Sequence, residues 1–293
     1  MRVRGSFLMS LYLFQTLNGL GLGLIYFLMG LGLTIIFGMM NFVNFAHGVF
    51  YAAGAFICYQ FIAWTGMFWV GLFAGPIVVG LLALILERFL IRRLYASDHA
   101  VQILVTIGLM LILRESILLI WGTVPKNVSP PEILSGVLLI GDFAYPKYRL
   151  FIIGVTIVAS LGVWLLLERT RFGMTVRAGS ENPIMVSMLG VNTSKLFAAT
   201  FALGVTLAGL AGGLMAPIRG ASAFMGAEAL GIAFVVVVIG GMGSFVGALA
   251  GGLIVGLVQS FTSGFWPEGT NVMIYSVMAL IIMLRPNGLF GRS

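Results

Sequence analysis

The sequence predicts an all-α polytopic transmembrane bundle, and three observations support this fold class. Of the 293 residues, 60% are hydrophobic and only 9% are charged, whereas soluble domains carry about 25% charged residues. The mean hydropathy is +1.11. The apolar residues form long, glycine-rich stretches without alternating polarity, which favours helices over barrel strands. This composition disfavours a soluble enzyme, a disordered regulator and a nucleic-acid binder, and we expect no nucleic-acid partner.

Eight apolar stretches are long enough to span a bilayer. They cover residues 7–28, 31–63, 67–86, 103–121, 150–167, 196–216, 228–262 and 266–284. Most basic residues fall into four groups: near the N-terminus, after the third stretch, between the fifth and sixth stretches, and at the C-terminus. The positive-inside rule places all four groups in the cytoplasm. Both termini are therefore predicted to be cytoplasmic.

Two of these stretches, residues 31–63 and 228–262, are too long for one crossing. Each would form a helix of roughly 50 Å, against a hydrocarbon core of about 30 Å. Glycine-rich segments at residues 38–48 and 240–248 offer a break in each, and both read G-M-x-x-F-V when Gly38 is aligned with Gly241. This match marks a candidate internal repeat. We predict ten crossings with two broken helices; eight crossings with one terminus outside is the alternative.

Polar residues at the two breaks form the predicted substrate pathway. Asn41, Asn44 and His47 lie three residues apart, which would place them on one face of a helix. Gly243 and Ser244 occupy the second break. In transporters built from repeats, paired interrupted helices mark the substrate site, and polar side chains at membrane depth usually face a partner or a wet cavity. The alternative is that these side chains satisfy backbone groups freed by the break.

The polar connection at residues 168–195 has the pattern of a short helix. Ser180 is a candidate N-cap, Pro183 follows in the first turn, apolar residues recur at helical spacing, and Gly190 stands at the end. We predict an amphipathic helix on the cytoplasmic face that binds a protein partner. The alternative is a helix lying flat on lipid headgroups.

Arg114 and Glu115 lie inside the fourth apolar stretch. Adjacent residues on a helix do not face each other, so we expect each to have a separate partner. The side chains serve either a gate in the pathway or structural pairing near the outer interface.

Small residues four apart predict close approach of helix backbones. These pairs are Gly19 with Gly23, Gly247 with Gly251, and Gly252 with Gly256.

The motifs of common enzymes are missing from the sequence. None of the three lysines follows a glycine, so there is no G-x-x-x-x-G-K-[ST] phosphate-binding loop. The two histidines belong to no HExxH motif or carboxylate cluster, and Cys58 is the single cysteine. We therefore expect no enzymatic activity, no cofactor and no metal in this chain.

Three motifs resemble the LivH-type permease subunits of ATP-driven branched-chain amino-acid importers. They are N-F-A-H-G at residues 44–48, an R-x-G-x-x-x-R-A…N…L-G-[VI]-N pattern at residues 171–192, and G-G-x-G-S-x-x-G-A at residues 240–248. Their order and spacing cover the chain from about residue 14 to residue 292.

The resemblance implies a single transmembrane permease domain, residues 1–293, in the bacterial inner membrane. It also implies four kinds of partner: the lipid bilayer, a second homologous permease, a periplasmic solute-binding protein, and two ATP-binding subunits that hold ATP and Mg²⁺. Residues 168–195 look like the coupling loop for the ATPases. The implied coupling residues are Arg171, Gly173, Arg177, Glu181, Asn182, Pro183, Leu189 and Gly190.

By the same resemblance, the solutes carried are branched-chain amino acids or related small polar molecules. The alternative function is a passive channel or facilitator for urea or a similar neutral solute. Asn44-Phe45-Ala46 is similar to the Asn-Pro-Ala element of water channels, but the proline and a second copy are absent.

Overall fold

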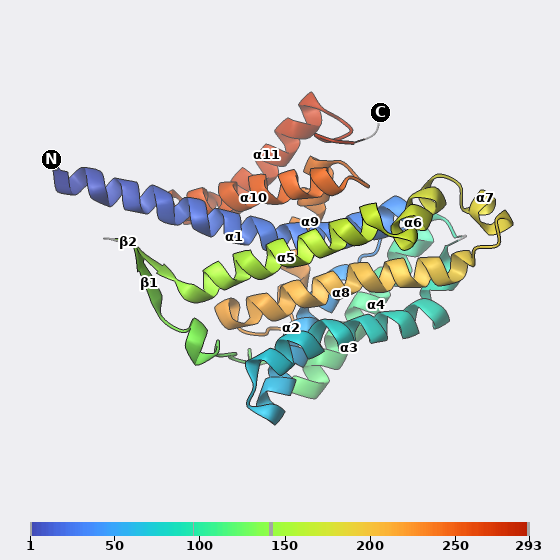
Figure 1. The fold of residues 1–293 in the computed structure, drawn as a ribbon, viewed down its shortest axis with the longest axis horizontal. Coiled ribbons are helices and arrows are strands. Elements are labelled where there is room, and N and C mark those ends of the chain that lie inside the picture. Colours follow the sequence, from blue (N-terminus) through green and yellow to red (C-terminus); the bar gives the residue numbers. More distant parts are fainter. Residues whose placement is uncertain (1, 96, 141–142, 292–293) are drawn as a thin grey trace.

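The computed structural model describes residues 2–95, 97–140 and 143–291, and nearly all of them belong to helices (Figure 1). The eleven α-helices of the described residues are α1 (Arg2–Met40), α2 (His47–Thr65), α3 (Phe68–Phe89), α4 (His99–Trp121), α5 (Lys147–Arg169), α6 (Arg171–Glu181), α7 (Pro183–Met188), α8 (Thr193–Arg219), α9 (Met225–Gly240), α10 (Phe245–Phe265) and α11 (Thr270–Leu284). Short 3-10 turns cover Ile91–Leu94, Glu132–Leu134 and Pro267–Gly269. The predicted all-α transmembrane bundle is confirmed.

Eight of the helices within the described part of the chain are long and apolar enough to cross a membrane. The shorter α9, 16 residues long, lies between the last residue of α8 and the second predicted break. Together with residues 220–224, α9 supplies one further pass along the bundle axis. Eight spans and this pass make nine, between the ten crossings predicted and the alternative of eight.

The first two apolar stretches are divided differently from the prediction. The helix α1 runs without interruption through residues 28–31, where we expected a boundary, and ends at Met40. Gly30 and Gly32 do not break it because both pack against neighbouring helices: a Cβ on Gly32 would lie 2.3 Å from the carbonyl oxygen of Gly204 in α8. The chain is interrupted at residues 41–46, inside the predicted first break.

The two termini lie at opposite ends of the bundle, which contradicts the prediction that they share one face (Figure 1). Asn18 of α1 bonds to Arg149 at the start of α5, whereas α6 follows the end of α5. The C-terminal segment lies at the α6 end, because Phe290 lines the same cavity as Arg177 of α6. The basic group after α3 lies at this end too, because the ring of Tyr95 packs against Phe197 near the start of α8. Three of the four basic groups are thus gathered at the α6 end, and the N-terminal group is not.

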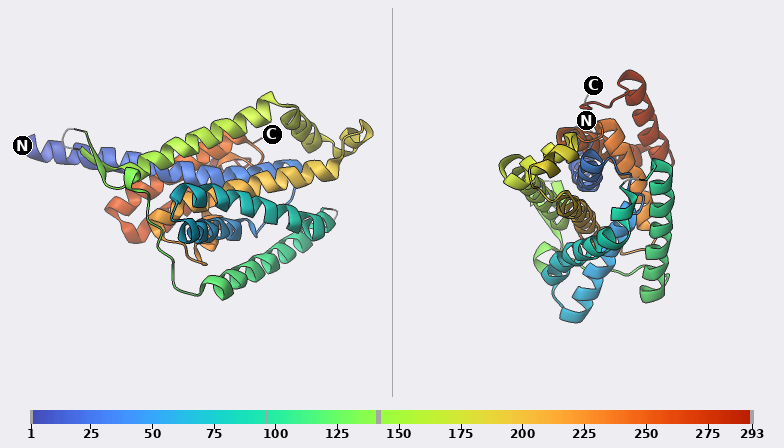
Figure 2. Two further views of the ribbon diagram at one scale, coloured as in Figure 1. Left: turned by 60° about the horizontal axis from the view of Figure 1, so that its bottom comes forward. Right: turned by 90° about the vertical axis from the view of Figure 1, so that its right-hand side faces the viewer.

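The buried centre of the bundle consists mainly of α1, α2, α8, α9 and α10, with α4, α5 and α11 largely exposed around it (Figure 2). Two of the three predicted glycine pairs form the contact between α1 and α10. A Cβ on Gly256 of α10 would lie 2.3 Å from the backbone nitrogen of Gly23 in α1. The α1–α10 seam, defined by Gly19, Gly23, Gly252 and Gly256, is therefore closed to larger side chains.

A two-stranded antiparallel hairpin lies at the N-terminal end of the bundle. Its strands are β1 (Val137–Ile140) and β2 (Phe143–Pro146), with Val137 paired to Pro146 and Ile140 to Phe143. The strand β2 leads directly into α5. Tyr145 of β2 packs edge-on against Phe14 of α1, with ring centroids 5.6 Å apart, so the hairpin holds the start of α5 beside α1.

Candidate functional site

The first break is a non-helical turn between α1 and α2. Asn41 has φ +46°, a left-handed conformation that asparagine tolerates better than most residues. The Asn44 Oδ1 atom accepts a hydrogen bond from the Ala46 backbone nitrogen at 3.1 Å, which closes the turn before α2 begins. Because residues 41–46 are not helical, Asn41, Asn44 and His47 do not share a helix face. That part of the prediction is wrong.

Asn44 and His47 are fully buried against the centre of the bundle. The His47 Nε2 atom lies 3.2 Å from the carbonyl oxygen of Met29, and it donates, since a carbonyl can only accept. The Nδ1 atom of His47 and the Nδ2 atom of Asn44 have no hydrogen-bond partner among the described residues. His47 holds the start of α2 against α1, Asn44 closes the turn before it, and neither lines the cavity described below.

The second break separates α9 from α10 and uses glycine and serine. Gly241 and Gly243 have φ of +96° and +83°, which glycine adopts without strain. Ser244 caps α10, because its Oγ atom accepts a hydrogen bond from the Gly247 backbone nitrogen at 3.0 Å. The sequence pattern G-x-G-S therefore encodes the end of one helix and the start of the next.

The C-terminal segment completes the end of α9. The backbone nitrogens of Leu289 and Phe290 donate to the carbonyl oxygens of Ile239 and Gly240, at 2.9 and 3.0 Å. The last carbonyls of a helix have no partner inside the helix. Residues 285–290 therefore form part of the second break.

The two breaks meet at the same end of the bundle. A Cβ on Gly38 would lie 3.1 Å from the Cα atom of Gly243, so the backbones touch there. The helices that follow and precede the breaks also approach each other, since a Cβ on Gly48 of α2 would lie 2.2 Å from the carbonyl oxygen of Gly226 in α9. The pairing of the interrupted elements expected from the sequence is present in space.

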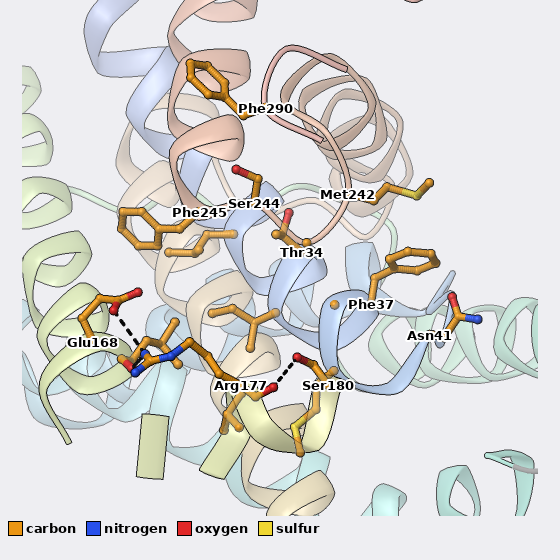
Figure 3. A pocket seen from close by; sticks show the side chains of 17 residues that line it. Thr34, Phe37, Asn41, Glu168, Arg177, Ser180, Met242, Ser244, Phe245 and Phe290 are labelled. Atoms are coloured by element: carbon orange, nitrogen blue, oxygen red, sulfur yellow. Dashed lines mark hydrogen bonds and ion pairs between the residues drawn. The ribbon is translucent and has the colours of Figure 1, made fainter. Parts of the chain in front are cut away.

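A cavity of about 650 Å³ opens where the breaks meet (Figure 3). Its walls come from α1, the end of α5, α6, the second break and the C-terminal Phe290. Asn41, Gly243 and Ser244 line it, as does the predicted coupling residue Arg177. We call it the inner cavity. Of the five predicted pathway residues, these three are brought together and Asn44 and His47 are not.

Sequence reasoning missed Thr34, which also lines the inner cavity. Its side chain is 3% exposed, and its Oγ1 atom has no hydrogen-bond partner in the described part of the chain. In Figure 3, Thr34 and Ser244 lie on facing elements of the cavity wall. Thr34 could have been predicted from the sequence, because it lies four residues before Gly38 and therefore on the same face of α1.

The helix α6 is tied to the end of α5 at the mouth of the inner cavity (Figure 3). Arg177 pairs with Glu168 at 3.3 Å and also donates to the carbonyl oxygen of Leu167. Gly173 packs so closely on α5 that a Cβ there would lie 1.9 Å from the Leu167 oxygen. Gly173 and Arg177, predicted as coupling residues, therefore fix α6 to α5.

The helix α7 exists as predicted, but its N-cap is Asn182 and not Ser180. The Asn182 Oδ1 atom accepts a hydrogen bond from the Met185 nitrogen at 2.9 Å, and Pro183 is the first helical residue. Ser180 lies in the last turn of α6, where its hydroxyl donates to the carbonyl oxygen of Arg177 at 2.7 Å. Gly190 ends the segment with φ +83°.

The outer face of α7 exposes four large apolar side chains. Ile184, Met185, Met188 and Leu189 are between 57% and 79% exposed. Arg171 and Glu181 are exposed on the neighbouring α6. We call these four apolar residues the α7 patch. Such a cluster, surrounded by polar residues, is typical of a surface that binds a partner.

Arg114 and Glu115 contact each other, contrary to the prediction of separate partners. The Arg114 Nη2 atom lies 2.9 Å from Glu115 Oε1, and the guanidinium also covers the Phe224 ring at 5.7 Å. Long side chains reach each other even though their Cβ atoms diverge. The pair is partly exposed, away from the inner cavity.

Comparison with known proteins gives one family. Residues 15–284 match the family described as branched-chain amino acid transport system / permease component. The chain is 30% identical to the high-affinity branched-chain amino acid transport system permease protein LivH of Escherichia coli, and also to BraD of Pseudomonas aeruginosa, over 96% of each chain. A probable LivH permease of Methanocaldococcus jannaschii is 28% identical over 88% of this chain and 84% of its own.

No solved structure matches the chain. The family match covers both breaks, the segment with α6 and α7, and all but the ends of the bundle. The chain therefore belongs to the permease component family of branched-chain amino acid transport systems.

Proposed function

We propose that this chain is the membrane-spanning permease subunit of an ATP-driven importer for branched-chain amino acids or a related small polar solute. The inner cavity is the observation on which the proposal rests. Two helix breaks, a capped helix start and α6 all contribute to its wall. A cavity shared by broken helices and a cytoplasmic segment can change its access when that segment moves.

ATP binding and hydrolysis belong to partner subunits in this proposal. Two ATP-binding subunits, which hold ATP and Mg²⁺, dock on α7 and its exposed apolar side chains. A second, homologous permease completes the translocation pathway against the exposed helices of this chain. A periplasmic solute-binding protein delivers the solute to the opposite end of the bundle.

Movement of α7 reaches the inner cavity through α6. Asn182 is the only residue between α6 and α7. Arg177 joins α6 to the end of α5, and Val176, Arg177 and Ser180 line the cavity. A rigid shift of α6 and α7 would displace this wall relative to the second break. The permease then alternates access without any covalent chemistry in this chain.

The proposed docking site also sets the orientation in a bacterial inner membrane. The α6 end is cytoplasmic, because ATP is there and because three basic groups gather at that end. The C-terminus is then cytoplasmic and the N-terminus faces the periplasm. The three basic groups at the α6 end favour this orientation, whereas only Arg2 and Arg4 at the N-terminus favour the opposite one.

A passive facilitator for urea is the less favoured function. A channel has no use for the exposed apolar face of α7, and the Asn44 side chain is buried in the turn before α2 instead of lining a pore. Membership in the permease family also favours the importer.

Affinity purification from native membranes tests the proposal. We expect the tagged chain to retain an ATPase, a second permease and, under mild conditions, a solute-binding protein whose ligand is a branched-chain amino acid. A matched purification of the Met188→Glu, Leu189→Asp variant controls for contact through α7. Recovery of the wild-type chain with no ATPase at all would contradict the assignment.

A further inference from the structure

A second cavity, of about 230 Å³, lies at the end of the bundle opposite α6 and α7. Four helices converge on it: α1, α5, α8 and α10, which run alongside one another in Figure 1. The volume is below the roughly 300–1,000 Å³ of pockets for drug-sized ligands, and so suits a smaller solute. We call it the outer cavity.

The polar wall of the outer cavity carries more positive than negative charge. Its polar lining residues are Asn18, Tyr145, Arg149, Arg219, Gln259 and Ser263. Arg219 pairs with Glu228 at 3.2 Å, whereas Arg149 bonds to the neutral amide of Asn18. The guanidinium of Arg149 thus has no carboxylate partner among the described residues. It retains N–H groups that a carboxylate can accept in bidentate fashion.

Two buried polar atoms at the same wall lack partners. Tyr145 is 1% exposed, and its hydroxyl lies beside the Arg149 guanidinium but has no hydrogen-bond partner within 3.5 Å in the described chain. The Gln259 Oε1 atom is likewise unpaired there. Burial raises the pKa of Tyr145 more than the nearby Arg149 lowers it, so the hydroxyl stays protonated and can donate. Buried polar groups without partners are rare, and a bound ligand would satisfy both.

The remaining wall is apolar and is formed by branched or flexible side chains. These residues are Leu22, Ile25, Ile152, Met215 and Ile218. Leu22 lies four residues after Asn18 and Ile152 three after Arg149, so each shares a helix face with a polar lining residue. The cavity therefore places hydrogen-bonding groups beside an apolar surface.

We propose that the outer cavity is a binding site for a solute that carries a carboxylate and a small branched apolar side chain. Arg149 binds the carboxylate, the Tyr145 hydroxyl donates to it, Gln259 Oε1 accepts from the solute ammonium, and Leu22, Ile25 and Ile152 contact the side chain. The assignment rests on the proposed importer function and adds a receiving site, distinct from the inner cavity, that the solute occupies first.

Binding of labelled leucine to the complete importer in lipid nanodiscs, without solute-binding protein, tests the site. We expect Arg149→Gln to weaken binding at least about tenfold, because a charge-assisted pair is lost. Tyr145→Phe should weaken it severalfold. The matched control is Lys147→Gln, which removes an exposed positive charge two residues away that does not line the cavity and should leave binding unchanged. Leucinamide, which lacks the carboxylate, should compete poorly.

Unchanged leucine binding in Arg149→Gln and Tyr145→Phe, with ATP-driven leucine uptake intact, would refute the site and leave the importer function standing. The complex could instead bind another carboxylate in a way that depends on Arg149, without binding leucine. That result would retain the site and refute the proposed substrate. Native mass spectrometry could show an anionic lipid that is retained only when Arg149 is present and that no amino acid displaces. That result would overturn the solute proposal. Arg149→Lys, which preserves the charge, should retain more binding than Arg149→Gln if the fold is intact.

Discussion

The α1–α10 seam and the α7 segment both use glycine, but for opposite purposes. In the seam, a Cβ on Gly256 would meet backbone atoms of α1 within 2.4 Å, whereas a Cβ on Gly190 after α7 would meet nothing within 4 Å. The seam glycine permits packing, and Gly190 permits a left-handed φ at an exposed helix end. The seam therefore has no room for a larger side chain, whereas α7 presents exposed apolar side chains.

Filling the seam should have the largest effect. Gly256→Leu places a side chain against the backbone of Gly19 and Gly23, which no change of rotamer can relieve. Overpacking lowers the free energy of unfolding by about 1–3 kcal/mol where neighbouring side chains can adjust. We expect a greater decrease here, because the neighbours are backbone atoms. The measurement is the yield of monodisperse protein in detergent. Gly108→Leu, on α4 with nothing within 4 Å, is the matched control and should fold normally.

Placing a charge on the α7 patch should abolish coupling and spare the fold. Leu189 is 78% exposed, so Leu189→Asp removes no buried contact within the chain. Altering a residue that dominates an interface reduces the binding free energy by about 2 kcal/mol or more, which weakens partner affinity by more than tenfold. Co-purification of the ATPase and uptake should both fall, with the melting temperature unchanged. Leu189→Met, which keeps an apolar side chain, should retain both co-purification and uptake. Wild-type co-purification and uptake in Leu189→Asp would exclude α7 from the docking surface.

Reversing the charge at the α5–α6 junction should reduce uptake more than stability. Arg177 and Glu168 are each nearly half exposed, so their ion pair contributes little to stability. Arg177→Glu repels Glu168 and removes the bond to the Leu167 carbonyl, which loosens the connection between α7 and the inner cavity. We expect ATP hydrolysis to continue while uptake falls severalfold. The double variant with Glu168→Arg should recover part of the uptake, and no loss in the single variant would contradict this link.

Removing a helix cap at the second break should have the smallest effect. Ser244→Ala loses the bond to the Gly247 nitrogen, and loss of an N-cap costs about 1 kcal/mol. Thermal unfolding in detergent should show a modest decrease that Ser244→Asp largely restores. A loss of monodisperse protein as large as that of Gly256→Leu would show that the second break matters as much to stability as the seam.

The sequence predicted the helical fold, the places of both breaks and the glycine seam, because glycine spacing and hydropathy report local backbone requirements directly. It wrongly placed both termini at one end of the bundle (Figure 1), because the two arginines at the start of the chain were counted in the same way as the basic residues at the other end. The positions of the basic residues do not show that α1 is one helix through residues 28–31 to Met40. The predicted number of crossings before α3 was therefore wrong.

The site residues were predicted in part. Asn41, Gly243 and Ser244 line the inner cavity, while Asn44 closes the turn before α2 and His47 bonds to α1, so both are buried. Thr34 and the outer cavity were missed. Their residues come from helices far apart in sequence, and spacing along one helix does not show which helices converge.

Uptake of labelled leucine into proteoliposomes tests the central claim most directly. Vesicles that contain this chain, its partner permease, the ATPases and the solute-binding protein should accumulate leucine only with ATP on the side of α7, and vesicles that contain this chain alone should carry none. Flux through the chain alone, independent of ATP, would contradict the importer and favour a facilitator.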